Sequence, residues 1–457
     1  MCMDSDLECT AQEWNPGVTG IHRVGPGLRE LAEALLALPE QRCPHVGFIG
    51  YGDVKPGDKV LFAVDTHYEP EVVSLVVDVL RARGARVDVL WADVGPDREF
   101  DDLDEILVVI RNEHWAKNPR RWEGLPWVEE LAERHGYHLL IHGKGGPIPN
   151  TPYRYEQFPF LRTEHLAQGA HAFPPELHRL INRKTWEKIW VHGRGAKVRL
   201  TDPEGTDITW TLHEGYYTGD RRGFTADPVR HYGHLHGHPP TPILPEEDAT
   251  GVIAGTTSHF GRPFPLIRLQ LEAGRLERVE GGGRYGQAWQ ELLEATRHIH
   301  YPCFPREGLF WLWECAIGTN PRIRRPSNIH RLSSGGFEWE RRRSGIIHIG
   351  IGTRWRGPEE AWAAERGLTY GHLHVHLLFP TYEILKPDGT KVKVIDHGRL
   401  TALDDPEVRE CARKYGDPDE LLREDWIPSI PGINAPGSFE DYARDPARYI
   451  YGEAGSG

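Results

Sequence analysis

Hydrophobic and polar residues alternate near the start of the chain in the pattern of a strand–helix–strand unit. Lys59 to Val64 is a short apolar run, and Arg86 to Trp91 is another. Between them, Pro70 to Arg83 carries apolar residues at helical spacing behind a proline suited to a helix start, and Gly84 fits the C-cap. Two strands joined by one helix predict a βαβ unit and therefore a parallel sheet. The runs at 103–111 and 138–142 continue the alternation.

From about residue 186 the pattern changes to shorter runs broken by glycine and proline. Such runs are typical of a sheet-rich α+β domain, and we expect one clear helix within it, near 287–297. Strands are predicted at 186–191, 197–200, 207–212, 251–255, 266–271, 346–351 and 372–379.

The sequence thus predicts an α/β N-terminal domain with a parallel sheet, followed by a sheet-rich α+β C-terminal domain that binds a metal. We expect four parts, which are an N-terminal arm (1–50, with a helix near 28–38), the α/β domain (51–185), the metal-binding catalytic domain (186–400) and a C-terminal arm (401–457). The last part is acidic and aromatic, and we expect it to pack as a short helix and an arm on its own domain or on a neighbouring subunit.

Composition narrows the class of protein. The formal net charge of −13 over 457 residues argues against nucleic acid as a partner, since phosphate binding needs a positive field. No apolar run is long enough to span a bilayer, and the polar, acidic N-terminus does not resemble a secretory signal. The six cysteines are scattered without a CxxC pair, which favours free thiols in a reducing compartment. We therefore expect a cytoplasmic protein that acts on a small molecule, away from membranes. We also expect a homo-oligomer.

Three histidines alternate with apolar residues at His372, His374 and His376. In a strand, side chains two residues apart share a face, about 6–7 Å apart. Two imidazoles at that spacing can reach one metal ion, and a third can support them. The alternative is an exposed strand face that is merely rich in histidine. The apolar residues between and after the histidines favour a buried strand and metal binding.

A lone carboxylate, Glu314, lies among Trp311, Trp313 and Cys315. An uncompensated charge in such surroundings is costly, so Glu314 either binds a cation or pairs with one of the arginines that follow it. A further histidine, His348, alternates with isoleucines beside glycines, and a hydrogen-bonded core histidine is as consistent with that pattern as a ligand. Glu314 with two histidines matches the set that binds non-haem Fe(II) with open positions, and it also suits catalytic zinc.

Five segments taken in order resemble the aminopeptidase T superfamily over roughly residues 50–400. The segments are Gly205-Thr206-Asp207-Ile208, Ala273-Gly274-Arg275 with Glu280-Gly281-Gly282, Glu314 with Gly318-Thr319-Asn320-Pro321, His348 to Gly352, and His374-Val375-His376. This superfamily contains metallo-aminopeptidases with two metal ions and also 2,5-dihydroxypyridine 5,6-dioxygenase, an Fe(II) ring-cleaving enzyme.

The resemblance implies ligand roles for particular positions. Glu314 and His374 match metal ligands, His348 matches a peptidase ligand, and His376 stands where the family usually carries Asp. The peptidases have one more metal-binding Glu, and the stretch 238–244 that corresponds to it has no carboxylate. A shifted alignment would bring in Glu246 or Glu247. As it stands, the resemblance favours one metal ion over two, which weighs against peptide hydrolysis.

The sequence therefore predicts a mononuclear metal enzyme that oxidises or ring-cleaves a small polar molecule, with Fe(II) favoured over Zn(II) or Co(II). A zinc or cobalt hydrolase of the aminopeptidase type is one alternative, and a catalytically silent ligand-binding member is another. Glu314, His374 and His376 are the predicted ligands, and His348 and His372 are expected to act as a fourth ligand, as support for a ligand or as a proton shuttle. The predicted substrate-binding residues are Trp311, Trp313, Trp355, Arg322 and Arg324.

Overall fold

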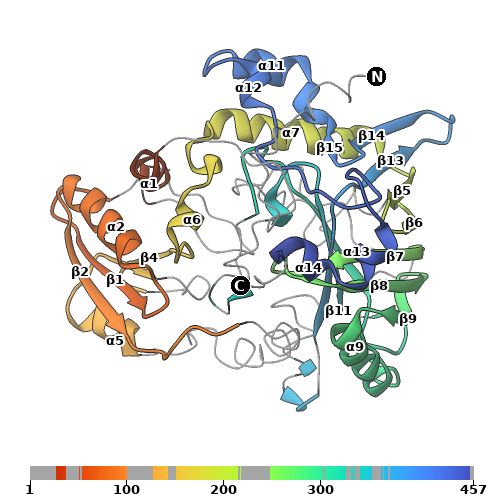
Figure 1. Cartoon of the computed structure of the whole chain (residues 1–457), viewed down its shortest axis with the longest axis horizontal. Coiled ribbons are helices and arrows are strands. Elements are labelled where there is room, and N and C mark those ends of the chain that lie inside the picture. The colour runs from red at the N-terminus through yellow and green to blue at the C-terminus, as the bar shows by residue number, and fades with distance from the viewer. Residues whose placement is uncertain are drawn as a thin grey trace.

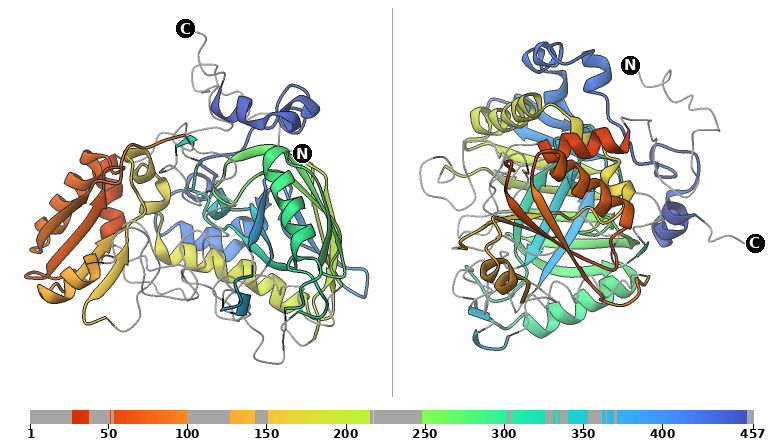
Figure 2. Two further views of the ribbon diagram at one scale, coloured as in Figure 1. Left: turned by 90° about the horizontal axis from the view of Figure 1, so that it is seen from below. Right: turned by 90° about the vertical axis from the view of Figure 1, so that its left-hand side faces the viewer.

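The structure of the chain is a computed structural model. It describes residues 27–37, 51, 54–99, 127–142, 151–214, 217, 248–301, 304–325, 331–332, 334, 340–352, 362–363, 365–368 and 371–452. A parallel sheet with its helices lies at one end of the long axis, and a large antiparallel sheet lies at the other (Figures 1 and 2).

The N-terminal part is a parallel sheet between two layers of helices, as the sequence predicts. Its four strands run in the order β2-β1-β3-β4, all parallel to their neighbours. Successive side chains of β1 point to opposite faces. Phe62 therefore lies in the core beneath α1 and α2, while Leu61 and Ala63 contact the core beneath α5. The bounds are α1 Leu28–Ala37, β1 Lys59–Asp65, α2 Pro70–Ala82, β2 Arg86–Ala92, α5 Trp127–Arg134, β3 Leu139–His142 and β4 Arg154–Gln157. The strand expected at 103–111 lies outside the described residues.

The C-terminal part is built on an eight-stranded antiparallel sheet in the order β15-β14-β13-β5-β6-β7-β8-β9. It confirms the strands expected near 197–200, 207–212, 251–255 and 266–271, and α9 confirms the expected helix. The bounds are β5 Lys197–Asp202, β6 Thr206–Thr211, β7 Thr250–Thr257, β8 Pro263–Glu272, β9 Arg275–Gly281, α9 Gly283–Thr296, β13 Thr381–Leu385, β14 Lys391–Asp396 and β15 Arg399–Leu400.

The strand predicted at 186–191 is wrong, because these residues form the end of a long helix, α7 (Pro175–His192). Six residues, with apolar side chains at both ends and two polar ones between, are too short a window to distinguish a strand from a helix. The preceding turns of the helix do distinguish them, since Leu177, Leu180 and Ile181 recur at helical spacing and are buried in the C-terminal core. The expected domain boundary at 185/186 accordingly falls inside α7.

A smaller antiparallel sheet of three strands carries the candidate site. Its strands are β10 (Leu312–Ile317), β11 (Ile347–Gly352) and β12 (His372–Leu377), in that order. One face of this sheet, which carries residues such as Ile349 and Val375, packs in the main hydrophobic core. The opposite face holds the alternating histidines, and every residue of β11 and β12 is buried. A face that combines polar side chains with complete burial needs internal partners for them.

The C-terminal residues pack on their own chain. The helices α13 and α14 contact β8, and Trp426 and Tyr442 are fully buried in a small core of their own. The bounds are α11 Pro406–Ala412, α12 Pro418–Leu421, α13 Phe439–Arg444 and α14 Pro446–Tyr451, and the shorter helices earlier in the chain are α6 Thr163–Leu166, η1 Gly169–Ala172, η3 Glu340–Arg342 and η4 Thr401–Asp404. Within the described ranges, no helix has both the length and the apolar character needed to cross a membrane.

A buried acidic pair lies in the turn between β5 and β6. Asp202 accepts hydrogen bonds from the backbone N–H groups of Glu204 and Phe379, each at 2.9 Å, and Glu204 accepts one from the Thr256 hydroxyl at 2.7 Å. Burial raises the pKa of Asp202 to about 6. Burial and the charge of Asp202 raise the pKa of Glu204 to about 8.

These raised pKa values give a testable pH dependence. Between the ordinary carboxyl pKa and pH 8 the folded chain holds more protons than the unfolded chain, so folding stability falls as pH rises through this window. Replacing Glu204 with Gln should therefore raise the unfolding free energy at pH 8, by on the order of 1 kcal/mol, and much less at pH 5. Urea unfolding at both pH values measures this, with Glu133→Gln on exposed α5 as the control. An equal change at both pH values would contradict it.

Candidate metal centre

Strand register places the candidate residues in two rows across the three-stranded sheet. Glu314 on β10 is opposite Gly350 on β11, and Gly350 is opposite His374 on β12. In the next row, Ala316, His348 and His376 are aligned. Because residues two apart share a face, both rows project to the same side of the sheet.

Gly350 leaves the middle of the first row without a side chain. A Cβ atom there would lie 2.9 Å from the Glu314 Cβ and 3.0 Å from its Oε2. The carboxylate of Glu314 therefore occupies space that any other residue at position 350 would fill. The glycine noted in the sequence beside His348 thus has a steric role next to the site.

A β-bulge at Trp313 brings an aromatic ring to the same place. The register shifts between Leu312 and Glu314, so that Trp313 is the extra residue of β10. Its ring centroid lies 5.5 Å from that of His372 and 6.4 Å from that of His374. Trp313 thus contributes a flat apolar wall next to the histidines, which is consistent with its predicted role in substrate binding.

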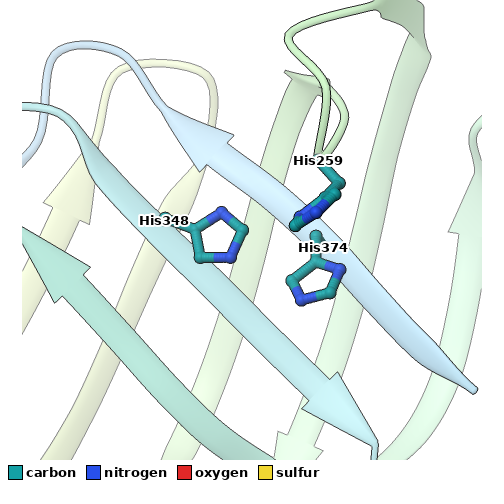
Figure 3. Close-up of side chains that lie close together, drawn as sticks. All are labelled: His259, His348 and His374. Atoms are coloured by element: carbon teal, nitrogen blue, oxygen red, sulfur yellow. The ribbon is translucent and has the colours of Figure 1, made fainter. Parts of the chain in front are cut away.

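A third histidine reaches the cluster from the large sheet. His259 lies in the turn between β7 and β8, which is closed by a 2.8 Å hydrogen bond from the Ser258 N–H to the Arg262 carbonyl. Donor atoms of His259, His348 and His374 all lie within 4.8 Å of one another (Figure 3). The His259 ring centroid is 4.3 Å from that of His374.

Close packing of the two sheets explains why His259 lies next to His348 and His374. Strand β7 packs against β12, and a Cβ atom at Gly255 on β7 would lie 2.6 Å from Val375 Cγ1. The absence of a side chain at Gly255 lets the strands approach, and the turn that follows β7 then lies over the histidine face (Figure 3). Nothing in the spacing of the sequence marks His259, so only the tertiary structure identifies it.

Glu314 completes the cluster. Its Oε2 lies 3.4 Å from His348 Nε2 and 3.9 Å from His374 Nε2. Atoms that each bind one ion at about 2 Å are at most about 4 Å apart, so a metal would need only small movements to draw these donors together. Three imidazoles and one carboxylate form a donor set that suits a divalent transition metal.

The state of His374 is compatible with metal binding. Burial lowers its pKa well below the ordinary value, and His259, His348, His372 and Arg341 lower it further. A neutral imidazole keeps the lone pair that a metal needs. Its Nδ1 is buried and has no hydrogen-bond partner among the residues that the structure describes. Such an atom is rarely left without a partner.

The other two predicted histidines surround this cluster. The ring of His372 lies parallel to that of His374, with centroids 5.9 Å apart. Nε2 of His376 lies 2.8 Å from Nδ1 of His348, a hydrogen bond between the two rings. His376 is therefore directed at His348, and its assignment as a ligand stays a prediction.

The remaining predicted residues lie in three kinds of place. Trp311 is fully buried in the main core, where its indole N–H donates to the Gly308 carbonyl at 3.0 Å. Arg322 pairs with Asp425 at 3.1 Å, and Arg324 donates to the Ala167 carbonyl at 2.6 Å. Both arginines thus hold neighbouring segments together, and their role in substrate binding stays a prediction. Trp355, Glu246 and Glu247 lie outside the described residues.

Comparisons with known proteins find likenesses among solved structures. No family model matches the chain, and no curated protein matches it. Among solved structures, it is similar to 2,5-dihydroxypyridine dioxygenase from Pseudomonas putida KT2440, with 14% identity, a TM-score of 0.42, and coverage of 84% of this chain and 98% of that one. It is also similar to wild-type AmpT from Thermus thermophilus, with 16% identity, a TM-score of 0.42, and coverage of 82% and 98%. At these scores neither likeness carries an argument about the site, and the family remains a resemblance.

The steric role of Gly350 can be tested directly. Replacing it with Ala should push the Glu314 carboxylate away from the histidines and weaken binding of a divalent metal by roughly 10- to 100-fold, as losses around a metal site commonly do. Titration calorimetry of the metal-free protein with Co(II) measures this, with circular dichroism to check the fold. Gly416→Ala is the matched control, since a Cβ there meets only Leu421 side-chain atoms at 3.4 Å and beyond. Unchanged affinity in Gly350→Ala would exclude Glu314 as a donor.

Proposed function

We propose that this chain is a mononuclear metalloenzyme whose ion is held by His259, His348, His374 and Glu314. The observation that carries the proposal is the convergence of these four donors from two sheets on one place, where His259 is half-buried and the other three are buried. The resemblance in the sequence supports it, because it implies ligand roles for three of the four residues. His259 replaces His376 in the set proposed from geometry.

The number of donors supports an octahedral ion. Four protein ligands close a tetrahedral zinc site, which is the arrangement of structural zinc, whereas the same four leave two open positions on octahedral Fe(II). Two open positions are enough for a substrate atom and dioxygen. We therefore propose Fe(II) as the ion and an oxidation or ring cleavage as the reaction, with iron supplying the activation of dioxygen when bound.

The residues around the donors fit a small polar substrate with a flat part. Trp313 offers a ring face beside His374, and offset stacking on it would orient an aromatic substrate. Arg341 is buried, and its charge adds to the effect of burial in lowering the pKa of His374, so a positive group acts on that ring. An anionic or hydroxylated substrate would be favoured there. His372, which lies beside both His374 and Trp313, is placed to exchange a proton with a bound substrate.

Metal content tests the proposed ligands. Protein purified without oxygen and reconstituted with Fe(II) should hold one ion per chain, and His259→Ala should lose most of it because one of four donors is missing. His135→Ala, at the exposed end of α5, is the control and should keep the ion. Two ions per chain, or full metal content in His259→Ala, would contradict the proposal.

The reaction is tested separately with a panel of hydroxylated pyridines and benzene carboxylates. Oxygen uptake should accompany loss of the substrate, stop when Fe(II) is chelated, and return with Fe(II) but not with Zn(II). An oxygen electrode and absorbance of the aromatic ring follow both changes. Cleavage of an aminoacyl anilide by the zinc-loaded protein at full rate without oxygen would favour the hydrolase instead.

A further inference from the structure

The hydrogen bond between His376 and His348 is part of a longer buried chain of polar groups. Beyond His376, its Nδ1 lies 4.0 Å from Oε2 of Glu340. Glu340 is fully buried and pairs with the buried guanidinium of Arg325, whose Nε lies 3.3 Å from the same Oε2. The chain therefore runs from the donor cluster through two imidazoles to a carboxylate that is fixed by an arginine.

We infer that His376 is a positioning residue that orients His348 toward the metal, and that Glu340 in turn orients His376. This inference rests on the proposed metal site. It gives a specific role to the histidine that occupies the position where the resembling family carries Asp.

The hydrogen-bonding capacity of the rings supports this assignment. His348 Nε2 lies 3.4 Å from the Glu314 carboxylate, so this nitrogen points toward the proposed ion. A neutral imidazole that gives Nε2 to a metal carries its proton on Nδ1. That proton points at His376 Nε2, 2.8 Å away, which then has to accept.

The same reasoning extends to Glu340. If His376 accepts at Nε2, its own proton is on Nδ1, the atom that lies toward the Glu340 carboxylate. The separation of 4.0 Å is longer than a hydrogen bond, but the negative charge still favours a proton on that side of the ring. A carboxylate that acts through histidine on a ligating histidine is a recurrent way of fixing the orientation of a metal ligand.

Packing fixes the far end of the chain. The Arg325 guanidinium lies 5.1 Å from the ring centroid of Trp426, and the Trp426 carbonyl accepts a 2.7 Å hydrogen bond from Arg343 Nε. Trp426 and Glu340 are both fully buried. The carboxylate therefore has little freedom to move away from His376.

Two substitutions at one position test the inference. His376→Leu removes the acceptor for the His348 N–H, while His376→Gln keeps an acceptor oxygen of similar reach. In Co(II) titrations of metal-free protein, the Leu variant should bind one ion per chain roughly 10- to 100-fold more weakly than the wild type, with altered visible absorption bands of the bound Co(II). The Gln variant should recover most of the affinity and the wild-type bands.

His171→Leu is the matched control for loss of a buried histidine. His171 is buried in the N-terminal part, where its Nε2 lies 3.1 Å from the His165 carbonyl. Its replacement should lower the melting temperature without changing the Co(II) affinity or the absorption bands. A general loss of packing is thereby separated from a specific effect on His348.

The outcomes separate this inference from the proposed function. Wild-type affinity and bands in His376→Leu would overturn the inference and leave the metal site intact. Complete loss of Co(II) in both folded variants would overturn it too, because His376 would then be a ligand. Failure of the wild type to bind Co(II) would instead refute the metal site itself. If the Leu variant does not fold, Glu340→Gln decides, with a several-fold weaker affinity supporting the inference and wild-type affinity overturning it.

Discussion

The candidate site depends on one physical constraint, which is that ionisable side chains on a buried sheet face must be neutral or paired. In the three-stranded sheet this constraint applies to one face only, since the other face is apolar and belongs to the main core. The low pKa of His374 shows the first solution, an imidazole kept neutral by burial and by neighbouring positive groups. The ion pair of Glu340 with Arg325 shows the second. Glu314 needs partners as well, and the imidazole nitrogens beside it are the groups that its carboxylate approaches.

Small residues decide how closely the donors approach. Gly350 leaves room for the Glu314 carboxylate, and Gly255 lets β7 lie against β12. The bulge at Trp313 adds a residue to β10 and brings its ring beside His372 and His374. A strand of larger residues would bury more apolar area, but it would separate the donors. The local irregularities of the sheet are therefore what allows a compact donor cluster.

The C-terminal residues contact the buried polar groups next to the candidate site. Trp426 covers the Arg325 guanidinium, and Tyr442 lies 3.2 Å from the Thr256 hydroxyl, which also bonds the buried Glu204. Both carboxylates near these contacts, Glu340 and Glu204, are buried. The acidic, aromatic segment, which the sequence predicts to pack on its own domain or on a neighbouring subunit, thus packs on its own chain and forms one wall of the polar interior. In the described residues, the site is a product of both sheets and of this C-terminal wall.

Local patterns in the sequence were enough to identify most of the elements and part of the site. Helical spacing and short apolar runs determined the βαβ unit, and alternation of period two determined the strand that carries His374, because these periods follow from backbone geometry alone. The same reasoning singled out Glu314, since a lone carboxylate among tryptophans needs a partner. The pattern of apolar residues gave a wrong prediction at 186–191, where six residues are too few to separate a strand from the last turns of α7.

Only the tertiary structure decided which side chains converge. His259 comes from a turn 115 residues before His374 in the sequence, and no periodicity links a turn in one sheet to a strand in another. The direction of His376 toward His348 likewise follows from the register of β11 and β12, which pairs these two residues. Sequence spacing states which residues share a strand face, but contacts between strands and between sheets are set by packing, and packing is a property of the whole fold.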